Sequence, residues 1–440
     1  MKKEDITKFI IEWQNHILQI KGIKRRIEND VFESIGSKPI KIITGFRRSG
    51  KSFFVQQIAK KLIESTLIPV TNILYINFED FRVLEINSPE KLDAIYQVFI
   101  HEIVQKDHQK IIIFDEIQKV NMWDRFIRTL YEKEQDIQIV LTGSNSELLS
   151  SELGSNLAGR FIEFSIQPFD FQEYLTYHHI AFSDHLDYYR NRKEINRHFS
   201  NYVKFGGLPE SLTITNEKAR ISYMEGIISK VILDDIINRF RVKNSMVIEK
   251  ILTYLLSSPG NIISFKKIGN YLKILGLRVK QETLINYVQF MIKTFAIHEL
   301  NKFDWKLGKI FSTTRKYYAV DTGLLNLSVD RHENYSKRLE NIVFTKLLAS
   351  TKQLYFGALP SGKEIDFIAQ NKQGNYTKFQ ITQELQTNNF DREFSSFDLK
   401  DTYLSEGNNY LLVLDDVDEA IKYKQITIQK KSIIRWLLAN

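Results

Sequence analysis

The stretch IITGFRRSGKSFF, residues 42–54, decides the fold of the amino-terminal part of the chain. From Gly45 it reads G-F-R-R-S-G-K-S, which satisfies the pattern G-x-x-x-x-G-K-[ST]. The preceding KPIKIITG is typical of a buried strand, and the following SFFVQQIAKKLIES has apolar residues at helical spacing. A glycine-rich turn between a strand and a helix points backbone N–H groups at phosphate. The stretch therefore predicts a phosphate-binding loop.

Each residue of this loop has an expected role. Lys51 would reach the β- and γ-phosphates of ATP, and Ser52 would hold Mg²⁺. Arg47 and Arg48 would either help to hold the anionic nucleotide or cap nearby carboxylates, and the sequence leaves both alternatives open. The other loop residues expected to contact the cofactor are Gly45, Ser49, Gly50 and Phe53.

A P-loop needs a carboxylate opposite it, and the stretch KIIIFDEIQKV supplies two at the end of an apolar strand. Asp115 would bind Mg²⁺ through water, and Glu116 would polarise the attacking water. Downstream, IQIVLTGSNSELL is a further short buried strand that ends in polar residues. Ser144 or Asn145 would lie between the two motifs and sense the γ-phosphate.

Four strands, 40–44, 73–78, 111–114 and 138–142, alternate with helical stretches. This alternation predicts an α/β fold with a parallel sheet and crossover helices.

The composition of the 440 residues sets broad limits. The length indicates about two to four domains. The absence of cysteine excludes disulfides, thiolate nucleophiles and cysteine-based zinc sites. No run reaches the roughly 18 apolar residues of a membrane span, and MKKEDITKFI is unlike a secretory signal. We therefore expect a cytoplasmic protein with no membrane partner.

Six short motifs follow one another across residues 40–210: GFRRSGKS, DEIQ followed by Trp123, LTGSNSELL, LAGR, PFDFQEYL and GGLPE. Together they resemble the bacterial and archaeal ATPases of the AAA+ superfamily that carry a GxRRxGKS P-loop. The resemblance implies a P-loop core with a helical lid, ATP and Mg²⁺ as cofactors, and hydrolysis of ATP to ADP and phosphate. GGLPE is expected to begin the lid, which brings Gly207 to the cofactor.

By the same resemblance, Arg160 of LAGR contacts the γ-phosphate, either within one chain or from a neighbouring subunit. A monomer and a nucleotide-dependent homo-oligomer both stay open. The implied catalytic set is Glu116, Lys51, Arg160 and Asn145.

The net charge of +8 is concentrated in one region. Residues 241–320 hold fourteen Lys or Arg against four Asp or Glu, a net charge of +10. A basic block inside a nearly neutral chain points to a polyanionic partner of one domain.

The same region has the pattern of a winged helix-turn-helix. Helical stretches cover 246–257, begin after Ser264 and begin at Lys280, and the alternating FAIHELNKFD and KIFSTTRKYYAV would form a two-stranded wing. We expect this module to contact DNA, although such modules also dock proteins or serve as ATPase lids. The sequence identifies no protein partner. The expected DNA contacts are Lys266, Lys267, Arg278, Lys280 and Gln281.

The last 120 residues contain a helix with LENIVFTKLLAS and the strands QLYFGAL, EIDFIAQ, KFQITQEL and NNYLLVLDD. They resemble the C-terminal domain of unknown function that accompanies these ATPases, and through it the PD-(D/E)XK restriction-nuclease fold. The resemblance implies a helix Glu, a strand Asp and an E-x-K that collect metal ions and activate water. Glu340 and Asp366 match the first two.

The third motif departs from the pattern, because the strand reads Gln380-Ile381-Thr382. It lacks one metal-ligating carboxylate and the lysine. We therefore expect a nuclease-like fold without nuclease activity, and weak Mg²⁺ binding at Glu340 and Asp366 stays open.

The expected domains are an N-terminal helical segment at 1–35, an AAA+ P-loop core at 36–180, a helical lid at 181–245, the winged helix-turn-helix at 246–320 and the nuclease-like α/β domain at 321–440. Two functions remain. One is a Mg²⁺-dependent ATP-hydrolysing switch or motor that couples nucleotide state to the basic module on DNA. The other is a DNA- or protein-tethering regulator that holds nucleotide with little turnover. Glu116 favours the first, because only hydrolysis needs a water-polarising carboxylate.

Overall fold

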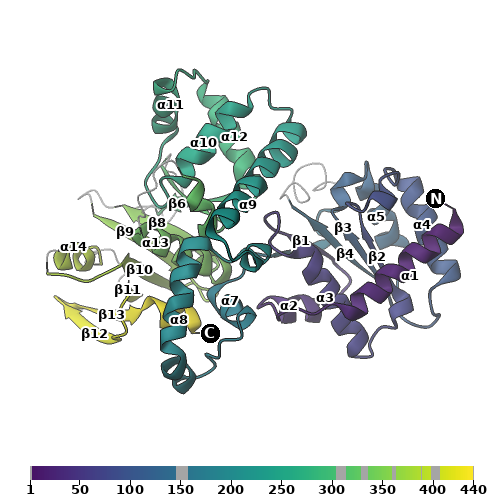
Figure 1. Ribbon diagram of the computed structural model, residues 1–440, viewed down its shortest axis with the longest axis horizontal. Helices are drawn as coiled ribbons and strands as arrows, with labels where there is room; N and C mark the ends of the chain where they lie inside the picture. The colour runs from purple at the N-terminus through teal and green to yellow at the C-terminus, as the bar shows by residue number, and fades with distance from the viewer. Residues whose placement is uncertain are drawn as a thin grey trace. The chain divides into compact units, whose positions relative to one another are not determined.

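The computed structural model describes residues 2–144, 157–303, 314–328, 335–358, 363–387, 389–397 and 407–439. The chain divides into two compact units (Figure 1). The first comprises Met1–Gln167 with Lys293–Phe295, and the second comprises Pro168–Ile292 and Ala296–Asn440. Each unit is described by itself.

The first unit contains a parallel five-stranded sheet in the order β2-β3-β4-β1-β5. Four of its strands were predicted from their buried, β-branched runs, and the structure confirms them. The fifth, β5, was not predicted, because it is a partly exposed edge strand without an apolar run. The strands are β1 (Ile40–Thr44), β2 (Ile73–Asn77), β3 (Lys110–Asp115), β4 (Ile137–Gly143) and β5 (Phe161–Ser165).

Helices cover both faces of this sheet (Figure 1), because successive strand residues point to opposite sides. Ile40 and Ile42 of β1 pack in one core with helices α1, α4 and α5, whereas Ile43 packs in the other core with α2 and α3. The helices are α1 (Lys3–Gln19), α2 (Glu28–Ser34), α3 (Lys51–Glu64), α4 (Pro89–Glu102) and α5 (Trp123–Lys133), with short 3-10 turns at Val70–Asn72, Phe81–Val83 and Ile117–Lys119.

The amino-terminal helices belong to this unit. Phe9 and Ile10 of α1 are buried in the same core as Leu74 and Ile76 of β2. The expected boundary near residue 35 therefore does not separate two folded parts.

The second unit begins with helices. They are α7 (Phe171–Tyr177), α8 (His185–Phe205), η5 (Pro209–Thr213), α9 (Glu217–Lys230), the π-helix η6 (Val231–Asn238), α10 (Ser245–Leu256), α11 (Phe265–Ile274) and α12 (Gln281–Lys293). Side-chain caps fix several starts: Asp170 and Glu173 form a capping box, and Asn244 and Ser264 cap α10 and α11. The predicted helices at 246–257 and after Ser264 correspond to α10 and α11.

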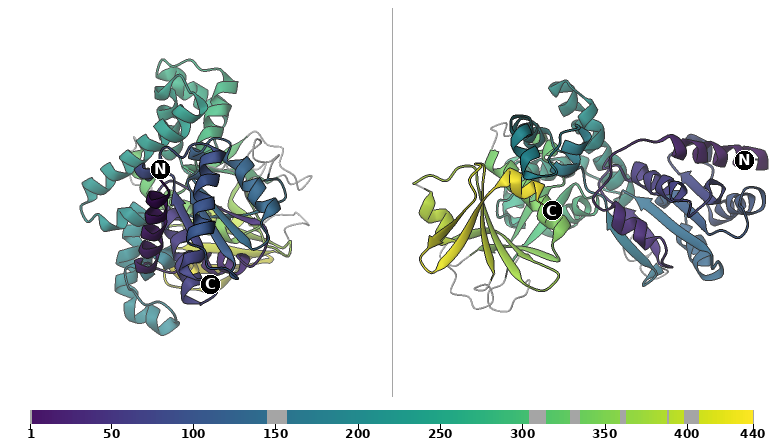
Figure 2. Two further views of the ribbon diagram at one scale, coloured as in Figure 1. Left: turned by 90° about the vertical axis from the view of Figure 1, so that its right-hand side faces the viewer. Right: turned by 90° about the horizontal axis from the view of Figure 1, so that it is seen from below.

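An eight-stranded mixed sheet follows, in the order β12-β13-β11-β10-β9-β8-β6-β7, and Figure 2 shows its green to yellow strands from below. The strands are β6 (Ile297–Lys302), β7 (Arg315–Ala319), β8 (Gln353–Ala358), β9 (Glu364–Gln370), β10 (Tyr376–Thr382), β11 (Asn408–Val413), β12 (Glu419–Tyr423) and β13 (Ile426–Ser432). Its helices are η7 (Thr322–Leu327), α13 (Tyr335–Ser350), α14 (Phe390–Ser395) and α15 (Ile433–Leu438).

The expected wing is part of this large sheet. Strands β6 and β7 pair antiparallel, as predicted, but β6 also pairs in parallel with β8 through Asn301 and Lys302. The expected boundary at 320–321 therefore cuts one continuous sheet, and the other expected boundary, at 180–181, lies beyond the division after Gln167.

Among the described helices, none is both long enough and apolar enough to cross a membrane.

Candidate nucleotide site

The loop between β1 and α3 has a backbone that only glycine adopts easily at two positions. Gly45 has φ +142°, and a Cβ there would collide with the carbonyl oxygen of Ile166 at the end of β5. Gly50 has φ +95° and lies directly before α3. The two glycines allow the chain to turn sharply and to present the start of α3 to the loop.

Lys51, the first residue of α3, is buried and folds back over the loop. Its Nζ donates to the carbonyl oxygens of Gly45 at 3.0 Å and Phe46 at 3.1 Å. Ser49 is also buried, and its hydroxyl has no hydrogen-bond partner among the described residues. Phe53, by contrast, is 41% exposed.

Asp115 is the last residue of β3 and is fully buried at the same sheet edge. Its Oδ2 accepts a hydrogen bond from the Tyr75 hydroxyl at 2.8 Å, and its Oδ1 accepts one from the Thr142 hydroxyl. Burial raises the pKa of Asp115, and hydrogen bonds from Thr142 and Ser52 oppose this rise. The loop serine and the strand carboxylate are therefore direct neighbours.

Glu116 follows in a left-handed conformation, φ +56°, which is unusual for a residue other than glycine. Its N–H donates to the Thr142 hydroxyl at 3.0 Å, and its Oε2 accepts hydrogen bonds from Gln118 and, at 3.4 Å, from Ser144. Burial raises the pKa of Glu116, whereas the charge of Lys51 lowers it.

Ser144 is buried directly after β4, which lies between β1 and β3. The structure therefore brings together the loop, both carboxylates and Ser144, as the order of the motifs predicted. Asn145, the alternative to Ser144, lies outside the described residues.

Two charged residues near the loop were missed by the sequence analysis. Glu79, just after β2, forms ion pairs with Arg47 at 3.8 Å and with Lys119 at 3.2 Å. Arg25 is buried and donates to the carbonyl oxygens of Ser49 at 3.3 Å and Gln167 at 2.6 Å. Neither belongs to a recognisable motif, and both contacts join segments far apart in the sequence.

Arg47 therefore caps a carboxylate in this structure, which is one of the two alternatives left open. Its partner Glu79 also acts on Glu116, whose pKa it helps to raise. Arg48 stands in the left-handed region with φ +66°, and its side chain is exposed.

Arg160 lies at the amino-terminal ends of strands β1 and β5, whereas the loop follows the carboxyl-terminal end of β1. Strands β1 and β5 are parallel with Ile40 opposite Phe161, and the N–H of Ile40 donates to the carbonyl of Arg160 at 2.8 Å. The loop begins after Thr44, roughly 15 Å further along the sheet at about 3.3 Å per residue. The Arg160 guanidinium instead pairs with Glu132 at 3.3 Å.

Gly207 belongs to the second unit, and its N–H is already engaged. It donates to Asp321 Oδ2 at 2.7 Å, and the N–H of Gly323 donates to the other carboxylate oxygen at 2.8 Å. Burial raises the pKa of Asp321 to about 6. The neighbouring Gly206, with φ +71°, has no room for a Cβ beside this carboxylate. In this unit the two glycines pack around Asp321, a role that the sequence analysis did not foresee.

The residues beside the loop fit a magnesium ion that is bound together with a nucleotide. Ser52 and Asp115 supply oxygen ligands, which Mg²⁺ prefers. The part of the chain that the structure describes contains no group of three or more His, Asp or Glu side chains placed to hold a metal. Phosphate oxygens and water would therefore complete the coordination of Mg²⁺, as is usual for this ion.

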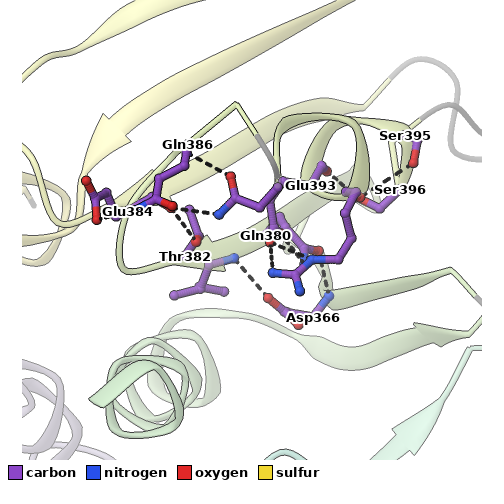
Figure 3. A network of polar contacts seen from close by, with 11 residues as sticks. Asp366, Gln380, Thr382, Glu384, Gln386, Glu393, Ser395 and Ser396 are labelled. Carbon is purple, nitrogen blue, oxygen red and sulfur yellow. Dashed lines mark hydrogen bonds and ion pairs between the residues drawn. The ribbon is translucent and has the colours of Figure 1, made fainter. Parts of the chain in front are cut away.

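The remaining expected site residues lie in the second unit. Lys266 and Lys267 are exposed in the first turn of α11, and Arg278, Lys280 and Gln281 are exposed at the start of α12 and before it. Glu340 of α13 and Asp366 of β9 are both buried. In place of the missing carboxylate, Gln380 accepts from the N–H of Asp366 at 3.3 Å and donates to Glu393 at 3.0 Å (Figure 3).

Residues 37–175 match the family described as AAA domain, and residues 196–334 match a domain of unknown function, DUF8612. An uncharacterised protein of Haemophilus influenzae is 31% identical over 366 residues, which cover 83% of this chain and 87% of that protein. An uncharacterised protein of Methanocaldococcus jannaschii is 29% identical over 420 residues, 94% of this chain and 90% of that protein.

Among solved structures, the Walker-type ATPase of Pyrococcus abyssi aligns with a TM-score of 0.48 at 16% identity, covering 71% of this chain and 99% of that chain. The identity and coverage of the H. influenzae protein are high enough to establish common descent. The chain therefore belongs to the same family as this H. influenzae protein, and its residues 37–175 form a AAA domain built on a P-loop.

Proposed function

We propose that the protein binds ATP with Mg²⁺ and hydrolyses it to ADP and phosphate. The proposal is carried by one observation: Asp115 ends β3 and Glu116 follows it at the same end of the sheet as the loop, and Asp115 is hydrogen-bonded to Ser52. The AAA family match of this region supports it.

The residues have distinct roles in this proposal. The Lys51 ammonium exchanges its two loop carbonyls for the β- and γ-phosphate oxygens. Ser52 and Asp115 hold Mg²⁺, which neutralises phosphate charge. Glu116 accepts a hydrogen bond from the attacking water, and Ser144 orients it from the neighbouring strand.

Phosphate release by wild type, Lys51→Ala and Glu116→Gln tests the proposal. Lys51→Ala should lose both nucleotide binding and turnover. Glu116→Gln should bind a fluorescent ATP analogue like wild type and lose at least about 100-fold in turnover, the usual effect of removing a general base. Glu85→Gln is the control, because it removes an exposed carboxylate of the same unit that has no assigned role. Equal, negligible turnover in all four proteins would contradict hydrolysis.

A specific observation favours the alternative, a nucleotide-binding tether with little turnover. The Glu116 carboxylate already accepts hydrogen bonds from Gln118 and Ser144, and burial raises its pKa. A carboxylate that is occupied by these hydrogen bonds is less available to the attacking water. Wild type that binds ATP but releases no phosphate even at pH 9 would establish the tether.

We further propose that α10, α11, α12 and the β6–β7 hairpin form a winged helix-turn-helix that binds DNA. The order of helices and strands supports this, as does the antiparallel bridge between Ile263, before α11, and Arg315 of β7. The net charge of +10 overstates the positive charge that the surface of this region offers to DNA. Arg315 pairs with Glu299 at 3.1 Å, and Lys316 is buried. The exposed cations of the described part of this region include Lys266, Lys267 and Lys273 on α11 and Arg278 and Lys280 in the following turn.

DNA affinity measured against salt concentration tests this module. Binding should weaken as salt rises, because each neutralised phosphate releases counterions. The pair Arg278→Ala and Lys280→Ala should lower the slope of log K against log salt by about 2. Lys372→Ala, which removes an exposed cation in the β9–β10 turn, should leave the slope unchanged. Absence of binding at low salt would exclude DNA.

The coupling between the two sites is proposed as well. DNA affinity should differ between the ATP-bound and ADP-bound protein, and Lys51→Ala should abolish that difference without changing DNA affinity in the absence of nucleotide. Identical affinities in both nucleotide states would leave an ATPase that is uncoupled from DNA.

For the carboxyl-terminal sheet we propose a nuclease-like fold without cleavage activity. The departure at Gln380 supports this, because its amide binds Glu393 and adds no negative charge. Plasmid cleavage with Mg²⁺ or Mn²⁺ that disappears in Asp366→Ala would overturn the proposal.

A further inference from the structure

Four charged side chains converge inside the second unit around one atom, the Nζ of Lys316. Lys316 comes from β7, Glu340 from α13, and Glu364 and Asp366 from β9. The Nζ lies 3.1 Å from Glu340 Oε1 and 3.9 Å from Asp366 Oδ1, and it forms a closer ion pair with Glu364 Oε1. Three carboxylates from two elements therefore surround one ammonium group.

This cluster, Lys316 with Glu340, Glu364 and Asp366, is largely withdrawn from solvent. The Lys316 side chain is completely buried, and those of Glu340 and Asp366 are 7% and 12% exposed. Isolated charges at such depth are strongly destabilising unless they are paired. The lysine is thus the cation that permits three acids to meet here.

Other contacts orient the carboxylates toward that one point. Glu340 Oε1 also accepts from the Tyr318 hydroxyl at 2.7 Å, and its Oε2 accepts from Lys337 at 3.1 Å. Asp366 Oδ2 accepts from the N–H of Ile381 at 2.9 Å (Figure 3), so that Oδ1 faces Lys316. The oxygens beside Lys316 are thus held by the surrounding structure and do not depend on the lysine alone.

The electrostatics agree with a tightly compensated cluster. Burial lowers the pKa of Lys316, but the charges of Glu340, Asp366 and Glu364 outweigh burial and raise it overall. Burial and the charge of Glu340 raise the pKa of Asp366 to about 8, against the opposing effect of Lys316. The ammonium of Lys316 and the carboxylates around it therefore stabilise each other's charged forms.

Carboxylate oxygens are also the ligands that a divalent cation prefers, although with Lys316 in place these described carboxylates do not come close enough together to hold one. We propose that the Lys316 ammonium occupies the position of a divalent metal ion among Glu340, Glu364 and Asp366, so that a metal binds there only when the lysine is removed. A lysine that stands in this position donates hydrogen bonds to the same oxygens but cannot activate water as a metal does. The proposal is independent of ATP hydrolysis.

An ion could reach this position from solvent. A cleft of about 320 Å³ adjoins the cluster, and Glu364 and Lys337 contribute to its wall. The turn before α11 forms the opposite wall, and Gly260 approaches Glu340 so closely that a Cβ would collide with its carboxylate. Removal of the lysine side chain would therefore open the cluster to this cleft.

The test is a Mn²⁺ titration of the full-length protein without nucleotide, followed by electron paramagnetic resonance of free Mn²⁺. Wild type should bind no Mn²⁺ at the cluster, whereas Lys316→Met should bind about one ion at roughly millimolar Mn²⁺ or below. The additional change Asp366→Asn in the Lys316→Met protein should remove that ion. Alkaline pH favours the ionised form of Asp366, as metal binding requires.

Lys337→Met is the matched control, because Lys337 also pairs with Glu340 but contacts Oε2, whereas Lys316 contacts Oε1. It should gain no Mn²⁺, since Lys316 still fills the position. Gain of an ion in both lysine variants would show a general effect of lost positive charge and would overturn the proposal.

Loss of Lys316 is expected to lower stability, and the thermal midpoint supplies a second measurement. Mn²⁺ should raise the midpoint of Lys316→Met and of Lys316→Gln, because a ligand that binds only the folded state stabilises it. Wild type and the doubly substituted protein should show no such rise. The proposal fails if wild type binds Mn²⁺ through Asp366, or if neither variant binds Mn²⁺ or is stabilised by it.

Discussion

At the scale of single residues, Thr142 holds the two acidic residues of the nucleotide site in place. Its hydroxyl donates to Asp115 Oδ1 and accepts from the N–H of Glu116, so that one β4 side chain fixes the end of β3. Neither the loop motif nor the acidic pair in the sequence indicates this bridge.

Thr142→Val keeps the shape of the side chain and removes both hydrogen bonds. We expect it to lower the free energy of unfolding by about 1–3 kcal/mol, because a buried carboxylate and a buried N–H lose their partner. Turnover should fall more than ATP binding, since Glu116 loses its support. Thr142→Ser, the matched control, retains the hydroxyl and should stay close to wild type in urea unfolding and phosphate release. Equal turnover in both variants would show that the bridge has no catalytic role.

Gly45 offers a second test of the loop. Gly45→Ala should destabilise the first unit by about 1–3 kcal/mol and abolish ATP binding, because both φ and the contact with Ile166 exclude a Cβ. Gly36→Ala is the control, since a Cβ there meets no atom within 4 Å. Binding of a fluorescent nucleotide and thermal unfolding measure both effects. Normal ATP binding by Gly45→Ala would show that the loop rearranges when it binds nucleotide.

The sequence allowed Lys51, Ser52, Asp115 and Glu116 to be placed in one site, because short motifs at the ends of parallel strands meet at one sheet edge. It did not reveal Arg25 or Glu79, whose contacts join segments that are remote in the sequence. Lys316 was missed for the same reason: it reaches the carboxylates from β7, whereas the nuclease pattern places its lysine two residues after the third acid. Tertiary contacts of this kind leave no local signal.

At the scale of elements, buried apolar strands were easier to predict than polar, partly exposed ones. β1 to β4 and β8 to β11 contain apolar runs, whereas β5, β12 and β13 are polar and partly exposed. The β6–β7 hairpin was predicted from alternation, but its parallel partner β8 could not be, because register between remote strands depends on the whole sheet.

Helices α7 and α8 meet through two half-buried histidines. The rings of His178 and His198 lie with their centroids 4.6 Å apart, and His178 Nε2 is buried with no hydrogen-bond partner among the described residues. Burial lowers the pKa of His178 to about 4 from an ordinary value of 6.5. The other titratable or charged groups that act on these two rings are Tyr174, Tyr177, His179, Glu194, Arg197 and Arg220.

This pair predicts a loss of stability in acid. Between pH 6.5 and 4 the unfolded chain binds a proton that folded His178 refuses, so acidification favours unfolding. His178→Phe keeps a ring in the same place and removes this proton. The thermal midpoint of wild type should therefore fall more between pH 7.5 and 5.5 than that of His178→Phe. Parallel curves for the two proteins would mean that His178 gains a proton without unfolding.

At the scale of the whole molecule, the position of Arg160 makes a neighbouring subunit the better candidate for its partner. Its strand register places it at the sheet edge away from its own loop, where it pairs with Glu132. We therefore propose that Arg160 acts on the nucleotide of another chain in a nucleotide-dependent oligomer.

Mixing two inactive variants tests this arrangement. The Lys51→Ala chain binds no nucleotide but still supplies Arg160. The Arg160→Ala chain binds nucleotide but lacks the arginine. A mixture of the two should therefore regain a substantial part of wild-type phosphate release. Arg128→Ala, which removes the other arginine on Glu132, should be active alone. A mixture as inactive as its components would favour action within one chain, after a rearrangement of the first unit.

The pairing of β6 with both β7 and β8 has a consequence for how such proteins can be recombined. The module of α10, α11 and α12 and the carboxyl-terminal sheet share the β6–β7 hairpin. A cut between the module and the sheet would therefore leave strands without their pairing partners. A gene fusion that exchanges only one of them would produce unpaired strands prone to aggregation. The two are therefore expected to be inherited as a single exchangeable cassette, with a natural junction upstream of the helices.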